Sequence, residues 1–262
     1  MRSEITASDE YHTREDTPHF WLDTITGRTR YVFTALFLKT VFQSRSLARQ
    51  GKYNSATWID TSHDIFTSVE RCGGRFHITG LDNLRHLNGP ALILSNHMST
   101  LETMIFPGII QPLVQITFVV KDALVKHWAF KDVMLSRDPI VLSRENPRED
   151  LKIVMEQGPE RLKMGISIVI FPQSTRRPVF RPEEFNSLGT KLAAKTGVQV
   201  VPVAVKTDFW GFSRVSSYLG PIYRDRPIYI EFGNAMKING SGKEEHQQIV
   251  NFIDSRIRSW SG

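Results

Sequence analysis

The sequence from Ala91 to Glu102 is ALILSNHMSTLE, and it joins an apolar run to a cluster of polar side chains. The run from Ala91 to Ser95 has the composition of a buried β-strand, and the residues after Thr100 have that of a helix. His97 and Glu102 therefore lie at a strand-to-helix junction, where ligand-binding and catalytic groups gather in α/β proteins. The segment predicts an α/β fold with a functional site at the end of this strand.

The spacing of His97 and Glu102 restricts how the two side chains can meet. At 100° per residue, the two positions would lie about 140° apart around a helix axis. They can meet only if His97 precedes the helix and Ser99 or Thr100 is its N-cap. An alternative without chemistry stays open, because Ser99-x-x-Glu102 is also a capping-box pattern in which the carboxylate bonds only to backbone N–H groups.

Outside this segment, short strand-like runs alternate with helical ones from Gly73 onward, as in α/β folds. The expected strands are 75–79, 91–95, 116–120, 140–142, 166–171, 198–205 and 228–232. The expected helices are 101–110, 122–136, 148–164, 185–196 and 243–260. Polar or turn-forming clusters follow several of these strands, among them VLSREN around Arg144, FPQSTRR at 171–177 and VPV at 201–203. Such clusters, in this order, predict one cleft.

The order of these clusters resembles that of the glycerolipid acyltransferase family, which includes 1-acylglycerol-3-phosphate acyltransferases. That family has NHxxxxD, a short run ending in Arg, FPEGTRS and a VPV-like strand; this chain has NHMSTLE, VLSR, FPQSTRR and VVPVAV. The match extends over about residues 75–210, and Lys121 in VKDAL resembles the family's lysine-bearing turn. The resemblance implies a mixed, largely parallel central sheet flanked by helices, and transfer of an acyl chain from a thioester to the hydroxyl of a lysophospholipid.

The resemblance also implies roles for individual residues. Histidine suits a general base because its ordinary pKa of about 6.5 leaves a neutral ring at physiological pH. We therefore expect His97 to deprotonate the acceptor hydroxyl and Glu102 to orient the ring. Arg144 and Arg176 match the family's phosphate-contacting arginines. The further substrate-binding residues that we expect are Lys121, Gln173, Ser174 and Thr175. Neither a metal nor a cofactor is expected, and acyl-CoA or acyl carrier protein would be the donor substrate.

Two departures from the family pattern bear on the acceptor. Glu102 replaces the usual Asp, and this longer carboxylate can still hold an imidazole. Gln173 and Ser174 replace a Glu and a Gly, which removes a charge beside the acceptor pocket. Another lysolipid or an amino-acid-based lipid therefore stays open as the acceptor. A hydrolase is disfavoured because the sequence has no G-x-S-x-G elbow to supply a serine nucleophile. A non-catalytic lipid-binding scaffold is favoured only if His97 and Glu102 lie far apart.

The N-terminal residues 1–72 differ from the α/β domain that we expect at 73–262. Residues 29–50 predict an amphipathic helix rich in apolar and basic side chains, and Trp58 to Arg71 predict a second one. The first helix can lie in the membrane interface or pack on the protein's own core. The run from Tyr31 to Phe42 is too short to span a bilayer, which needs about 20 apolar residues. No secretory signal is visible in residues 1–28.

Composition limits the partners. The chain of 262 residues has 33 Lys and Arg against 27 Asp and Glu, so 33 − 27 gives a net charge of +6. This surplus favours anionic partners such as membrane phospholipids, and nucleic acid is not expected because no recognition module accompanies the charge. The single cysteine, Cys72, excludes an internal disulfide. Together with the family's substrates, these features predict a peripheral protein on the cytoplasmic face of a membrane.

Overall fold

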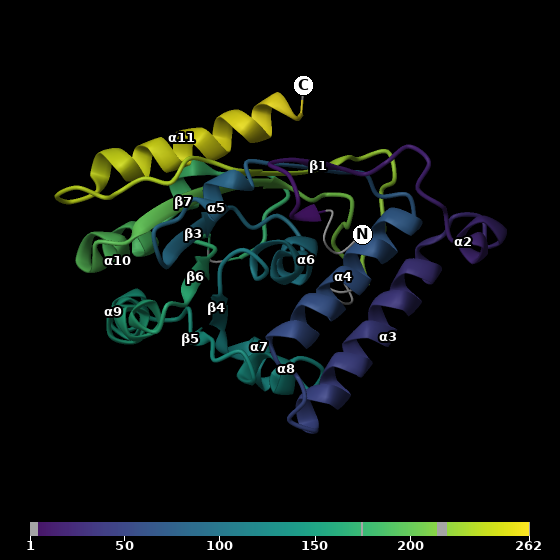
Figure 1. The fold of residues 1–262 in the computed structure, drawn as a ribbon, viewed down its shortest axis with the longest axis horizontal. Coiled ribbons are helices and arrows are strands. Elements are labelled where there is room, and N and C mark those ends of the chain that lie inside the picture. The colour runs from purple at the N-terminus through teal and green to yellow at the C-terminus, as the bar shows by residue number, and fades with distance from the viewer. Residues whose placement is uncertain (1–4, 174, 214–218, 262) are drawn as a thin grey trace.

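The computed structural model describes residues 5–173, 175–213 and 219–261. Its strands are β1 (Tyr11–His12), β2 (Phe76–Thr79), β3 (Ala91–Ser95), β4 (Ile116–Lys121), β5 (Ile140–Leu142), β6 (Ser167–Ile170), β7 (Gln199–Lys206) and β8 (Ile228–Phe232). In the described residues they form one eight-stranded sheet of order β1-β2-β8-β7-β3-β6-β4-β5 (Figure 1). Only the β1–β2 and β7–β8 pairs are antiparallel. The mixed, largely parallel sheet is therefore confirmed.

The central strands are apolar on both faces because helices cover both sides of the sheet. In β3, Ala91 and Ile93 face one hydrophobic core, whereas Leu92 and Leu94 face the other. This alternation within a continuous apolar run is typical of buried parallel strands. The run could therefore be recognised as a strand from its composition and length.

The longer helices divide between the two faces of the sheet. The helices are α2 (Trp21–Ile25), α3 (Arg30–Arg49), α4 (Ser55–Arg71), α5 (Asp82–Arg85), α6 (Leu101–Ile110), α7 (Asp122–Lys126), α8 (Lys131–Leu135), α9 (Pro147–Lys163), α10 (Leu188–Thr196) and α11 (Lys243–Ser259). Helices α9, α10 and α11 contribute to one hydrophobic core and α3, α4 and α6 to the other, on opposite sides of the sheet (Figure 1). A 3₁₀ turn at Pro182–Glu184 precedes α10.

The sequence-based expectation of one helix at 122–136 is wrong. The structure has two short helices, α7 and α8, because the backbone of His127 is extended (φ −71°, ψ 125°) and ends α7. The ring of His127 accepts a hydrogen bond from the Ala129 N–H at 3.3 Å, which stabilises the turn between the helices. The short strand β1, which pairs with β2, was not predicted either.

Helix α3 has one face on the protein core and another in solvent. Phe33 and Phe37 are buried against Trp210, with ring centroids 5.0 and 4.8 Å away. Leu38 and Phe42 on the outer side are 37% and 49% exposed. In the described residues, no helix combines the length and the apolar character that crossing a membrane requires.

Candidate active site

The predicted site residues follow four strands whose carboxyl ends lie at the same end of the sheet. His97 follows β3, Lys121 ends β4, Arg144 follows β5, and Gln173 and Arg176 follow β6. Because these strands are neighbours and parallel, the segments that follow them converge there. They line one cavity of about 670 Å³, together with Thr175. Ser174 lies outside the described residues.

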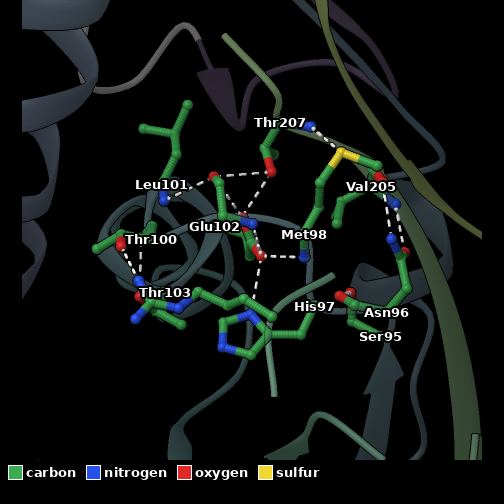
Figure 2. A network of polar contacts seen from close by, with 12 residues as sticks. Ser95, Asn96, His97, Met98, Thr100, Leu101, Glu102, Thr103, Val205 and Thr207 are labelled. Carbon is green, nitrogen blue, oxygen red and sulfur yellow. Dashed lines mark hydrogen bonds and ion pairs between the residues drawn. The ribbon is translucent and has the colours of Figure 1, made fainter. Parts of the chain in front are cut away.

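His97 and Glu102 are in direct contact. The Nδ1 atom of His97 lies 2.8 Å from Oε1 of Glu102, and Figure 2 shows the ring and the carboxylate facing each other at the start of α6. Helix α6 begins at Leu101, so His97 precedes it, as the spacing of the two residues requires. The condition that would have favoured a non-catalytic scaffold, a large separation of these side chains, is not met.

The Glu102 carboxylate is fully buried and accepts several further hydrogen bonds (Figure 2). Its Oε1 accepts from the backbone N–H groups of Met98 and Ser99, at 2.7 and 2.8 Å. Its Oε2 accepts from the hydroxyls of Ser99 and Thr207, at 3.0 and 2.6 Å. The carboxylate therefore makes the backbone contacts of the capping-box pattern and the contact with His97 as well, so the alternative in which it bonds only to the backbone is wrong.

These contacts keep the carboxylate ionised. Burial alone would raise the pKa of Glu102, but the hydrogen bond and charge of His97, with the Thr207 hydroxyl, lower the pKa below its ordinary value of 4.5. An ionised carboxylate only accepts hydrogen bonds, so Nδ1 of His97 carries the proton that it shares. In the neutral ring, Nε2 then has the free lone pair. Because the His97 side chain is 18% exposed and lines the cavity, this nitrogen is available to a ligand.

Two supporting contacts fix the segment that carries His97. The side chain of Asn96 donates to the carbonyl of Val205 at 2.9 Å and accepts from its N–H at 2.8 Å, which ties the end of β3 to β7. The His97 ring stacks on Phe171 with centroids 4.4 Å apart. The sequence analysis quoted Asn96 and Phe171 within its motifs without giving either a role, and it did not find Thr207 as a partner of the carboxylate.

Arg144 lies in a strained loop between β5 and α9. Its φ of 63° is in the left-handed region, which costs a residue with a side chain roughly 1 kcal/mol. Its backbone N–H donates to the Asp150 carboxylate at 3.1 Å, which holds the loop on the first turn of α9. Burial lowers the pKa of the Arg144 guanidinium, and the charge of Asp150 opposes this shift. An arginine remains protonated under such a shift, so Arg144 presents a cation to the cavity.

Arg176 and Arg177 differ in their surroundings. Arg176 lines the cavity, donates to the hydroxyl of Thr100 and lies 5.8 Å from the ring centroid of Phe212. The guanidinium of Arg177 instead donates to Glu184 at 2.8 Å. Its backbone N–H donates to the carbonyl of His97 at 2.8 Å. Arg176 is thus the arginine of this pair that faces the cavity.

The cavity continues from the polar residues into an apolar region between α3, α4, α7 and α8. The apolar residues that line this region are Val41, Trp58, Ile65, Phe118, Leu124, Phe130, Val133 and Met134. A volume of about 670 Å³ lies within the range of small-molecule sites. The same cavity therefore has positive charge and a candidate general base at the carboxyl ends of the strands. It has apolar surface farther away, between the helices.

Two further kinds of chemistry, metal binding and a cysteine nucleophile, depend on the remaining side chains. In the described part of the chain, no three His, Cys, Asp or Glu residues come together in a group that could hold a metal ion. Cys72 is buried, and burial raises the pKa of its thiol to about 12, with the Asp23 charge adding to the shift. A thiol in this state is a packed side chain and not a nucleophile.

Comparisons with known proteins show which family the chain resembles. A family model described as Acyltransferase matches residues 75–206. The 1-acyl-sn-glycerol-3-phosphate acyltransferase of Pseudomonas aeruginosa is 32% identical over 189 residues, which cover 72% of this chain and 68% of that protein. A chloroplastic enzyme of the same name from Arabidopsis thaliana is 32% identical over 133 residues, or 50% of this chain and 36% of that protein.

A solved structure supports the fold. The crystal structure of the 1-acyl-sn-glycerophosphate acyltransferase PlsC from Thermotoga maritima superimposes with a TM-score of 0.62. The superposition covers 100% of this chain and 98% of that one, at 17% sequence identity. At this identity, the likeness establishes a shared fold.

Proposed function

This chain belongs to the acyltransferase family and is an O-acyltransferase, and on that premise we propose that it acylates 1-acylglycerol-3-phosphate to give phosphatidic acid. The observation that carries this proposal is the cavity in which His97 lies between cationic and apolar surfaces. The cations suit a phosphate, and the apolar region suits an acyl chain. The names of the relatives from Pseudomonas aeruginosa and Arabidopsis thaliana specify the same acceptor.

In the proposed mechanism, Nε2 of His97 takes the proton of the acceptor hydroxyl as its oxygen attacks the thioester carbonyl carbon. A C–O bond forms, and the carbonyl electron pair moves to the oxygen. When this tetrahedral intermediate collapses, the C–S bond breaks and the thiolate leaves. The imidazolium returns the proton to the thiolate, so the ring is neutral again. Glu102 stabilises the imidazolium and fixes the tautomer, as the third member does in a serine-protease triad.

The donor is a fatty acyl thioester, either acyl-CoA or acyl carrier protein. The apolar region between α3, α4, α7 and α8 would hold one acyl chain, where each buried methylene contributes about 0.8 kcal/mol. Arg144 and Arg176, with Lys121 and Thr175, would hold the acceptor phosphate. Arginine is suited to this role because its planar guanidinium binds phosphate oxygens in pairs.

The test of this function is an acyl-transfer assay with purified protein and dispersed lysophosphatidic acid, supplied with acyl-CoA or acyl carrier protein donors. We expect phosphatidic acid as the product.

The variant Arg144→Ala should raise the KM for the acceptor roughly 10- to 100-fold and leave the KM for the donor unchanged. The reason is that a hydrogen bond to a charged group contributes about 1.5–3 kcal/mol. Arg148→Ala, which removes an exposed arginine in the first turn of α9, is the control. Product from another lysolipid but not from lysophosphatidic acid would assign a different acceptor.

We further propose that residues 1–72 attach the catalytic domain, 73–262, to the cytoplasmic face of a membrane as a peripheral protein. Support comes from the outer side of α3, where Tyr31, Leu38 and Phe42 share one stripe of the helix and are exposed. The ring of Trp128, between α7 and α8, is 58% exposed and lies 5.9 Å from that of Phe42. Lys39, which follows Leu38, is exposed too, so the helix presents both apolar and basic side chains, as do helices that bind membrane interfaces.

Membrane attachment predicts that the double variant Leu38→Ser, Phe42→Ser loses most of its binding to vesicles that contain anionic phospholipid. Each substitution removes apolar surface worth roughly 1.5–3 kcal/mol when fully buried in lipid. Co-sedimentation of the protein with vesicles measures the effect. Met164→Ser is the control, because Met164 is 65% exposed at the end of α9, on the other side of the sheet (Figure 1). Equal binding of the double variant and the control would contradict this attachment.

A further inference from the structure

The side chain of Gln173 is buried beside the residue that carries the proposed base. Gln173 is 2% exposed and follows the carboxyl end of β6, which lies beside the cavity. Its Oε1 accepts a hydrogen bond from the backbone N–H of His97 at 3.0 Å. Both residues line the cavity. The amide of Gln173 is thus held next to the reacting position by the same backbone that carries His97.

This hydrogen bond determines which way the amide points. The backbone N–H is a donor, so the oxygen of the Gln173 amide must face it, and the nitrogen takes the opposite place with two N–H groups to donate. Nε2 is buried, and within the described residues it has no hydrogen-bond partner. A buried donor without a partner costs about 1–3 kcal/mol, and such a group in a native structure calls for a reason.

A substrate oxygen would satisfy this donor. During the proposed reaction, negative charge develops on the thioester carbonyl oxygen, one bond away from the carbon that the acceptor attacks beside His97. A neutral amide in a buried site stabilises such charge strongly, because its dipole is already oriented and water does not screen it. We propose that Nε2 of Gln173 is a catalytic oxyanion donor, an inference that rests on the function proposed above.

The acceptor phosphate is a less suitable partner for this donor. The side chains that offer full positive charge to the cavity, Lys121, Arg144 and Arg176, are partly or fully exposed, whereas Gln173 is buried. A dianionic phosphate is bound more favourably where cations and water reach it. The carboxylate that the family has at this position could not donate, so the amide gives this chain a donor that a Glu would lack.

The variant Gln173→Glu tests the inference most directly. A carboxylate of nearly the same shape can still accept the hydrogen bond from the backbone N–H of His97, so this contact is retained. It cannot donate a hydrogen bond to an oxyanion. We expect kcat to fall about 10²- to 10³-fold with little change in either KM, the effect typical of losing one oxyanion donor. Arg181→Gln is the control, because it changes the net charge by the same amount at an exposed residue outside the cavity.

The possible outcomes separate this inference from the proposed function. A kcat within about threefold of wild type would overturn the inference, and so would a raised acceptor KM with unchanged kcat, which would assign the donor to the acceptor lipid. If circular dichroism shows that Gln173→Glu is unfolded, Gln173→Met decides, since it also lacks a donor and carries no charge; full kcat in that variant overturns the inference. The proposed function fails separately, if folded wild-type protein forms no diacyl product from lysophosphatidic acid with either thioester donor.

Discussion

Replacing His97 by Ala is expected to lower kcat by about 10²- to 10⁴-fold, the usual contribution of a positioned general acid–base group. The reason is the geometry of the ring, which lines the cavity, shares its Nδ1 proton with Glu102 at 2.8 Å and keeps the lone pair of Nε2 free. The contact of His12 with Glu10, by contrast, is exposed and lies outside the cavity. The acyl-transfer assay under saturating substrate measures the effect.

The matched control for this experiment is His86→Ala. His86 is exposed at the end of α5 and does not line the cavity. Thermal unfolding of both variants should show that the fold is retained, because the Glu102 carboxylate keeps its four other hydrogen-bond donors when the His97 ring is removed. Normal turnover of folded His97→Ala would exclude this residue as the base.

The central sheet could be predicted from sequence because its strands are buried on both faces. A continuous apolar run such as that of β3 is short, lies between turn-forming residues and has few other interpretations. The boundary between α7 and α8 could not be predicted in this way. It depends on the extended backbone of His127, in a stretch whose residue types are all compatible with a helix.

The candidate site was predictable where its residues belong to local patterns. His97 and Glu102 are close in sequence, and the arginines follow recognisable strands. The partners that support them come from remote segments: Thr207 is 105 residues from Glu102, and Gln173 is 76 residues from His97. Contacts at such separations depend on strand order, which the apolar pattern alone does not determine. For the same reason, the sequence suggested a loss of charge at Gln173 but not a donor beside the base.

The second large effect is expected at Glu102. In Glu102→Ala, the Nδ1–H of His97 loses its acceptor, and so do the buried N–H groups of Met98 and Ser99. Each buried donor that is left without a partner costs about 1–3 kcal/mol, so the free energy of unfolding should fall by several kcal/mol. The rate should fall about 10²- to 10⁴-fold, since the ring is then held in neither its tautomer nor its orientation. Urea unfolding and the acyl-transfer assay measure the two effects.

The variant Glu102→Gln separates the charge of this residue from its hydrogen bonds. The pKa of Glu102 is lower in the folded chain than its ordinary value of 4.5, so the unfolded chain takes up the proton first as the pH falls. The ionised group therefore stabilises the fold above about pH 4.5, and this contribution is lost as the pH falls through the folded-state pKa. We expect wild type to exceed Glu102→Gln in unfolding free energy at pH 7, and the difference to shrink as the pH falls below about 4.5. A difference that is constant with pH would mean that the carboxylate is not held ionised, and the tautomer assigned to His97 would lose its basis.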